Sequence, residues 1–183
     1  MQPQQEFMRE LRRLTGRTDR IFALTDLRCL LPEHSEAAFR PLVSRIVKRG
    51  DLIRLCRGIY MFPDCELRGG ALLGRVVALL RADCFNYLSL ETVLSEAGII
   101  SQVPLSGIAV MSSGRSNVIS CGDYGVIDIV HTQKTPEALR GDLTYDSGYG
   151  LWRASPEQAL RDIRDTHRDT GLVNWEIASE LVR

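Results

Sequence analysis

The clearest pattern of hydrophobic and polar positions lies between residues 35 and 62. Apolar residues recur there at the spacing of one buried helix face, at Phe39, Leu42, Val43, Ile46 and Val47. Ser35 precedes this segment as a helix cap, and Gly50 follows it, where helices commonly end in a left-handed residue. Pro41 predicts either a kink in this helix or a later start at Arg40-Pro41 after a separate turn.

A two-stranded ribbon is predicted directly after this helix. Residues 52–55 suit a short strand, Cys56-Arg57-Gly58 a turn, and residues 59–62 a return strand. Two shorter helices are predicted upstream, over residues 6–14 and from Thr25-Asp26 to Leu31. The order of three helices and a ribbon is that of a winged helix-turn-helix, and we assign it to residues 1–63.

The remainder of the chain predicts a separate, small α+β domain over residues 71–183, after a polar, glycine-bearing boundary at 64–70. We expect helices over 71–81, 90–97, 156–168 and 175–182, and strands over 107–112, 126–132 and 151–154. The intervening glycines and asparagine mark turns. Residues 143–150 could form a ligand or partner loop, although a surface hairpin is favoured. The predicted fold class is therefore α+β, with an N-terminal winged helix.

Charge changes this picture, because it is unevenly distributed along a chain whose formal net charge is zero. Residues 1–60 hold twelve Lys and Arg against seven Asp and Glu, a net charge of +5, which leaves −5 for the remainder. All basic residues are arginines except Lys48 and Lys134. Arginine binds phosphate and guanine edges through two parallel hydrogen bonds, so the asymmetry favours a nucleic-acid module in the first third.

We therefore predict that the protein binds operator DNA in a sequence-specific way and represses transcription by occluding the operator. The candidate DNA-binding residues are Ser35, Arg40, Ser44, Arg45, Lys48, Arg49, Arg54 and Arg57. Arg40, Ser44, Arg45 and Lys48 would enter or flank the major groove, and Arg57 would touch the backbone or the minor groove from the ribbon. Tyr60 and Phe62 could stack on a base, although packing against the helix is at least as well supported. The alternative function is a protein-interaction module that uses the same helix and ribbon to bind a partner protein.

Enzymatic chemistry finds little support in the sequence. The phosphate-loop, dinucleotide, zinc-protease and serine-hydrolase motifs are absent, so we expect no enzyme, cofactor or metal. Asp162, Asp165 and Asp169 share a helix face, but the arginines between them favour ion pairing on a solvated helix. The five scattered cysteines predict small buried thiols. No apolar run suits a membrane span or a signal peptide, so we expect a cytoplasmic protein.

Three segments, taken in order, resemble the AbiEi-type antitoxins and related bacterial transcriptional regulators of toxin–antitoxin systems. They are Lys48–Arg54 with Arg57-Gly58-Ile59-Tyr60, then Tyr87-Leu88-Ser89 running to Leu94, and Ser155-Pro156-Glu157 running to Asp162. The resemblance implies a repressor that regulates its own operon. It also implies antagonism of a nucleotidyltransferase-like toxin, exerted functionally rather than through a stable complex. A homodimer that places one copy on each half of a repeated DNA site is a further expectation.

Overall fold

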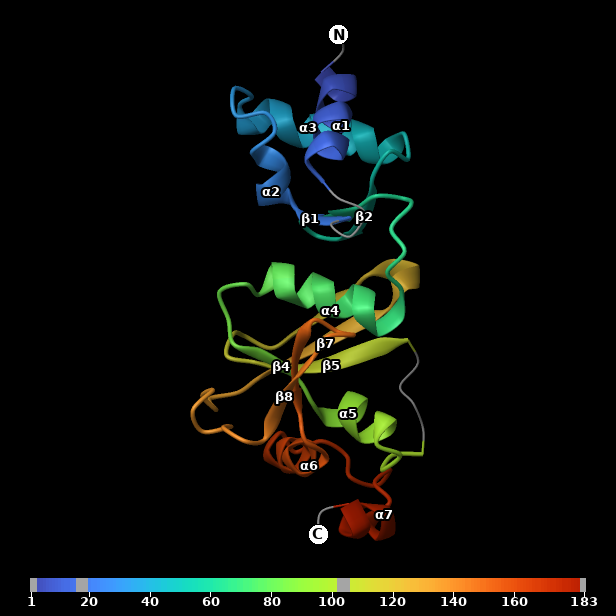
Figure 1. Ribbon diagram of the computed structural model, residues 1–183, viewed down its shortest axis with the longest axis vertical. Helices are drawn as coiled ribbons and strands as arrows, with labels where there is room; N and C mark the ends of the chain where they lie inside the picture. Colours follow the sequence, from blue (N-terminus) through green and yellow to red (C-terminus); the bar gives the residue numbers. More distant parts are fainter. Residues whose placement is uncertain (1–2, 16–19, 102–105, 182–183) are drawn as a thin grey trace. The chain divides into compact units, whose positions relative to one another are not determined.

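The chain folds as a mixed α+β protein, shown as a computed structural model in Figure 1. The structure describes residues 3–15, 20–101 and 106–181. Within them lie seven α-helices and two β-sheets, of three and six strands. The chain divides into two compact units, Met1–Leu67 and Arg68–Arg183. The division falls inside the polar segment 64–70 that separates the two predicted domains.

The first unit packs three helices against a three-stranded antiparallel sheet. Its elements are α1 (Pro3–Leu14), β1 (Ile21–Ala23), α2 (Leu24–Arg28), α3 (Glu36–Lys48), β2 (Ile53–Cys56) and β3 (Ile59–Met61). The strand order is β1-β3-β2, so β3 lies in the middle. One apolar cluster joins α1, α3 and the sheet, with Phe7, Phe39 and Ile46 almost fully buried. The predicted helix-helix-helix-ribbon order holds, and β1 is an addition that was too short to show as a pattern.

Helix α3 begins where its cap predicts. The Ser35 hydroxyl accepts a hydrogen bond from the Ala38 backbone N–H at 3.3 Å, and Gly50 closes the helix with φ +80°. The predicted later start at Arg40-Pro41 is wrong, because the helix runs through Pro41 from Glu36. Pro41 cannot donate to the carbonyl four residues before it. Both Pro41 and Ala37 are exposed, so water can satisfy that carbonyl instead.

The second unit is a six-stranded mixed sheet covered on both faces. Its elements are α4 (Gly69–Leu80), β4 (Asn86–Leu88), α5 (Leu90–Glu96), β5 (Gly107–Ser112), β6 (Asn117–Ser120), a 3-10 turn (Gly122–Tyr124), β7 (Val126–His131), β8 (Leu143–Asp146), β9 (Leu151–Ala154), α6 (Pro156–Asp165) and α7 (Trp175–Leu181). The strand order is β6-β7-β5-β4-β9-β8. Figure 1 shows α4 on one side of the sheet and α5 and α6 on the other. This double cover explains why every residue of β5 after Gly107 is buried.

Several predicted elements are confirmed, and others need correction. Strands β5 and β9 match their predicted ranges, and β8 pairs with β9 as the predicted surface hairpin. Strands β4 and β6 were missed. The helix predicted to reach Leu31 ends at Arg28, and the helix predicted to reach residue 168 ends at Asp165. The prediction of buried thiols holds for Cys56, Cys65 and Cys121, but Cys29 is exposed and Cys84 is only partly buried.

Two glycines of α4 let the turn between β8 and β9 approach the helix closely. A Cβ atom at Gly74 would lie 2.1 Å from the backbone oxygen of Tyr149, and one at Gly70 would lie 2.2 Å from the Tyr149 ring. A larger residue at Gly74 would require the backbone of the turn to move, and one at Gly70 would require the Tyr149 ring to move. The turn itself is held by the Tyr149 hydroxyl, which donates to Glu96, and by Arg153, which pairs with Glu96 at 2.6 Å.

Candidate nucleic-acid interface

The outer face of α3 carries four of the eight predicted DNA-binding residues, Arg40, Ser44, Arg45 and Lys48. Ala37, Pro41, Ser44 and Lys48 recur three and four residues apart along the middle of this face, and all are exposed. Arg40 flanks the row on one side and Arg45 flanks it on the other, because each lies less than a quarter turn from its edge. The opposite face is buried through Phe39, Leu42, Val43 and Ile46. The small residues in the middle leave the helix backbone accessible between flanking cations.

The start of α3 is fixed by a single arginine in the preceding helix. Arg28 donates to the backbone oxygen of Leu31 at 2.7 Å and also to that of His34, so it ties together the turn between α2 and α3. Its guanidinium carbon lies 5.2 Å from the centroid of the Phe39 ring, within the range of a cation–π contact. Arg28 is therefore a structural cation, and it positions the exposed face of α3 relative to the core.

The cations of α3 differ in whether the chain already neutralises them. Arg40 pairs with Glu36 at 2.6 Å, one turn earlier on the same exposed surface. Such surface pairs contribute about 0–1 kcal/mol, so a phosphate can replace the carboxylate. Arg45 and Lys48, in contrast, have no ion-pair or hydrogen-bond partner among the described side chains, and both are exposed. Two uncompensated positive charges therefore lie on this face.

The hairpin formed by β2 and β3 places its two arginines differently. Arg57 lies at the tip of a tight turn that Gly58 permits with φ +83°, and its side chain is exposed. Arg54 lies on β2, where its Nε donates to the Cys56 backbone oxygen at 3.3 Å. The Gly58 oxygen accepts a hydrogen bond from the Leu24 N–H at 2.8 Å, which anchors the hairpin tip beside the start of α2.

The suggestion that aromatic residues of the ribbon stack on bases is wrong. Phe62 is 1 % exposed and lies edge-on to Phe22, with ring centroids 5.4 Å apart. Tyr60 is 9 % exposed and belongs to the same apolar core. Both rings pack inside the first unit, so neither can reach a base.

A group of polar residues on α1 also belongs to this positively charged surface, although the sequence pattern did not indicate it. An open hollow beside this helix is lined by Gln4, Gln5, Met8, Arg9 and Arg12, together with Arg49 and Asp51 after α3. Arg49, a predicted site residue, lies here rather than on the outer face of α3, and it donates to Gln4 at 2.9 Å. The available signal was the run of arginines at positions 9, 12 and 13, which the amphipathic pattern of α1 overshadowed.

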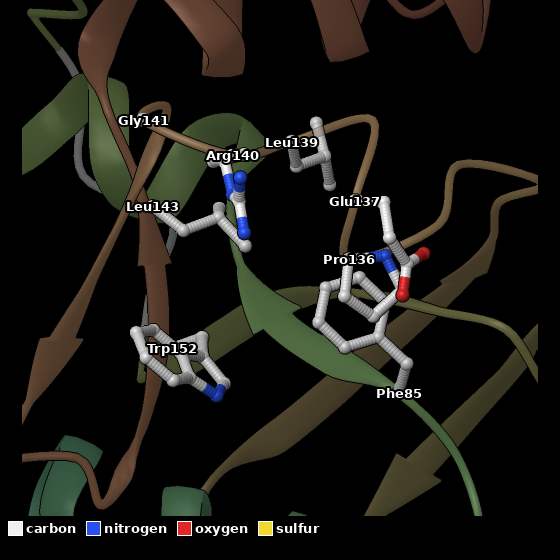
Figure 2. A pocket seen from close by; sticks show the side chains of 8 residues that line it. All are labelled: Phe85, Pro136, Glu137, Leu139, Arg140, Gly141, Leu143 and Trp152. Carbon is white, nitrogen blue, oxygen red and sulfur yellow. The ribbon is translucent and has the colours of Figure 1, made fainter.

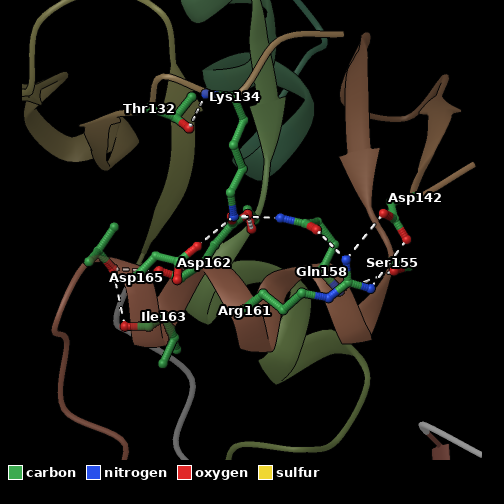
Figure 3. Close-up of polar contacts among 11 residues, drawn as sticks. Thr132, Lys134, Asp142, Ser155, Gln158, Arg161, Asp162, Ile163 and Asp165 are labelled. Atoms are coloured by element: carbon green, nitrogen blue, oxygen red, sulfur yellow. Dashed lines mark hydrogen bonds and ion pairs between the residues drawn. The ribbon is translucent and has the colours of Figure 1, made fainter. Parts of the chain in front are cut away.

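In the second unit, the predicted solvated ion pairing along α6 is wrong. Asp162 is fully buried and binds three side chains from other parts of the fold and from its own helix (Figure 3). The Lys134 ammonium lies 2.8 Å away, the Ser89 hydroxyl donates at 2.6 Å, and the Gln158 amide donates at 2.8 Å. Asp165 is exposed and binds the same lysine at 2.7 Å. The cluster is therefore an internal brace between α6, the end of β4 and the segment after β7.

Tyr87 lies beside this brace, and its hydroxyl has no hydrogen-bond partner within the described part of the chain. Burial raises the pKa of Tyr87, and the negative charge of Asp162 raises it further. For Lys134, burial acts in the opposite direction, but the hydrogen bonds to Asp162 and Asp165 prevail and raise its pKa. Tyr87, Ser89 and Asp162 come from two of the segments that resemble the antitoxin family. Those segments thus meet in the core of the second unit.

A second hollow, of about 450 Å³, opens on the second unit (Figure 2). Figure 2 shows Phe85 and Trp152 on opposite sides of it, with the Arg140 side chain at its rim. The other lining residues are mainly apolar, and Glu137 and Arg140 are both exposed. The hollow therefore holds no buried titratable group that could act as an acid or a base.

No family model and no curated protein matches this chain. Among solved structures, the chain is similar to the crystal structure of the RV2827C protein from Mycobacterium tuberculosis, with a TM-score of 0.58 and 16 % sequence identity. The alignment covers 97 % of this chain and 70 % of that one. At this sequence identity the similarity shows a shared fold and nothing beyond it. None of the described helices is both long and apolar enough to cross a bilayer.

Proposed function

We propose that this protein is a sequence-specific DNA-binding transcriptional repressor whose first unit is a winged helix-turn-helix. In this proposal α2 and α3 form the helix-turn-helix, and the hairpin of β2 and β3 forms the wing. The strand order β1-β3-β2 and the position of the hairpin directly after α3 support the assignment. The observation that carries the proposal is the outer face of α3, where the Arg45 and Lys48 side chains are exposed and have no ion-pair or hydrogen-bond partner among the described residues.

The shape of this face suits the major groove of DNA. Ala37, Pro41 and Ser44 are small, so the helix can approach base edges closely along its middle. Arg40 and Arg45 then lie on either side, where phosphates line the groove, and Lys48 continues the row toward the end of the helix. Ser35 serves the helix as its cap, which leaves its hydroxyl less available to DNA. Arg57 would reach the backbone from the wing tip.

Repression of the chain's own operon and antagonism of a nucleotidyltransferase-like toxin complete the proposal, and both rest on the resemblance to AbiEi-type antitoxins. Two of the resembling segments meet at the Ser89–Asp162 hydrogen bond of 2.6 Å. Buried motif residues of this kind support a shared scaffold for the second unit. A toxin would have to be recognised by other residues, on the exposed surface of that unit.

The proposal is tested by the salt dependence of binding to a labelled duplex of about 30 base pairs and random sequence, between about 50 and 200 mM salt. Each phosphate that the protein neutralises adds about 0.9 to the slope of log affinity against log salt. We expect the double variant R45Q/K48Q to lower the slope by about 1.8. The charge-matched control R75Q/R115Q changes two exposed arginines of the second unit and should leave the slope unchanged.

The same experiment separates the proposal from the protein-interaction alternative. A module that binds a partner protein through α3 would show no steep salt-dependent affinity for duplex DNA. An equal decrease in both double variants would mean that overall charge, rather than α3, determines binding. A random duplex reports contacts to the backbone, and the same titration with the promoter of the chain's own operon then measures specificity.

A further inference from the structure

The hollow beside α1 is a concave surface of the first unit that is rich in arginine. Its volume is about 360 Å³, and it lies between α1 and the turn that follows α3. Three arginines, two glutamines, one methionine and one aspartate line it: Gln4, Gln5, Met8, Arg9, Arg12, Arg49 and Asp51. The lining thus carries three cations against one carboxylate, together with amide groups that can donate hydrogen bonds.

The contacts within the hollow leave a positive excess. Asp51 pairs with Arg49 at 3.5 Å, and Arg49 also donates to the Gln4 side chain at 2.9 Å. Arg9 lies 3.5 Å from Glu10. Arg12 is exposed and has no ion pair or side-chain hydrogen bond within the described residues. An anion that enters the hollow would therefore meet at least one cation that the chain does not neutralise.

The hollow is continuous with the exposed end of α3. Arg49 follows Arg45 by one helical turn, on the side of α3 that faces away from Arg40. Helix α1 packs directly on α3, with the Phe7 and Phe39 ring centroids 6.3 Å apart and with Met8 in the same apolar cluster. A basic strip thus runs from Lys48 and Arg45 around the end of α3 to the hollow.

We propose that this hollow binds the sugar-phosphate backbone of the DNA whose major groove α3 enters. The inference rests on the proposed function and adds a second contact surface to it. Arginine forks and glutamine amides match phosphate oxygens. The hollow is open and its donors are exposed, so a single free phosphate would be held weakly. A backbone anchored nearby by α3 instead presents phosphates at high effective concentration.

The decisive variant is Arg12→Gln, with Arg13→Gln as the matched control. Arg13 is the next residue on the same helix, carries the same charge and is exposed, but it pairs with Glu10 at 2.8 Å and does not line the hollow. With the random duplex described above, R12Q should lower the salt slope by about 0.9, the contribution of one phosphate, while R13Q leaves it unchanged. The conservative variant R12K keeps the charge and should retain the parent slope.

Each outcome of this experiment bears on a different claim. If R45Q/K48Q lowers the slope but R12Q does not, the hollow is outside the interface and this inference is overturned while the proposed function stands. If the parent protein shows no salt-dependent binding to DNA, both the proposed function and the inference about the hollow are wrong. Inorganic phosphate at matched ionic strength provides the last arm. If millimolar phosphate binds the parent but not R12Q while the two give the same salt slope on DNA, the hollow is a small-anion site and the backbone assignment is wrong.

Discussion

Removing the Lys134 ammonium should destabilise the second unit strongly, and the substitution Lys134→Met does so while keeping most of the side-chain volume. Its partner Asp162 is fully buried, so the variant leaves a carboxylate with no cation to balance it. Removing one partner of a buried ion pair typically lowers protein stability by about 3–5 kcal/mol. Ser89 and Gln158 still donate to the carboxylate, at 2.6 and 2.8 Å, and the lysine is partly exposed. We therefore expect the lower end, about 3 kcal/mol.

The measurement is urea unfolding followed by tryptophan fluorescence. The chain has two tryptophans, Trp152 and Trp175, and both belong to the second unit, so the signal reports on that unit alone. A loss of about 3 kcal/mol should lower the urea midpoint by about 1–3 M. The pKa of Lys134 is raised in the folded protein, and this decides the pH of the experiment. The ion pair stabilises the fold fully below the pKa that Lys134 has in the unfolded chain, and this stabilisation is lost as the pH rises through the pKa of the folded protein. The comparison therefore belongs at neutral pH.

A second substitution should partly rescue the Lys134→Met variant. Adding Asp162→Asn to the Lys134→Met variant removes the unbalanced charge and keeps an oxygen that can accept from Ser89, so the double variant should be more stable than K134M alone. A midpoint shift equivalent to less than about 1 kcal/mol in K134M would refute the brace, since a buried unpaired charge cannot cost so little. A double variant less stable than K134M would refute it equally.

Other consequences of the structure can be measured separately. A change from glycine to alanine in most helices stabilises the protein by about 1 kcal/mol. Gly74→Ala should instead destabilise the second unit by about 1–3 kcal/mol in the same urea assay, because the new Cβ meets the Tyr149 backbone. A stabilised variant would contradict the close approach of the turn to α4. In thermal unfolding of the first unit, Ser35→Ala should lower the free energy of unfolding by about 1 kcal/mol and Ser44→Ala by less than about 0.5 kcal/mol. A larger loss for Ser44→Ala than for Ser35→Ala would contradict the capping role of Ser35. Burial, with help from the hydrogen bond to Glu96, raises the pKa of Tyr149 to about 12. Ultraviolet titration should therefore show a phenol near that pH that Tyr149→Phe lacks, and its contribution to stability should be lost as the pH rises from about 10.

The sequence predicts those elements whose signals are local. The cap at Ser35, the helical period and Gly50 define α3 within a residue or two. The glycine-bearing segment 143–150 and the strand predicted at 151–154 indicate the β8–β9 hairpin. Strand β4 has three residues, all buried, so it shows no alternation. Strand β6 is an edge strand of mostly exposed residues and has the composition of a turn.

The buried brace could not be predicted because its members are far apart in the chain. Ser89 lies 73 residues before Asp162, and Lys134 lies 28 residues before it. Viewed as a helix alone, α6 shows aspartates and arginines at pairing distance, and only the sheet beneath it reveals that Asp162 points inward. The α1 hollow was missed for a similar reason, since Arg49 joins Gln4 across 45 residues.

The central claim is that the outer face of α3 lies on DNA, and photocrosslinking tests it most directly. Benzoylphenylalanine in place of Ser44 puts the probe in the middle of that face, and the same probe in place of Val118, which is 66 % exposed on β6, provides a control in the second unit. On irradiation with a labelled duplex, the account predicts a DNA crosslink at position 44 that weakens as salt rises, and little at 118. Crosslinking at 118 with none at 44 would contradict the account.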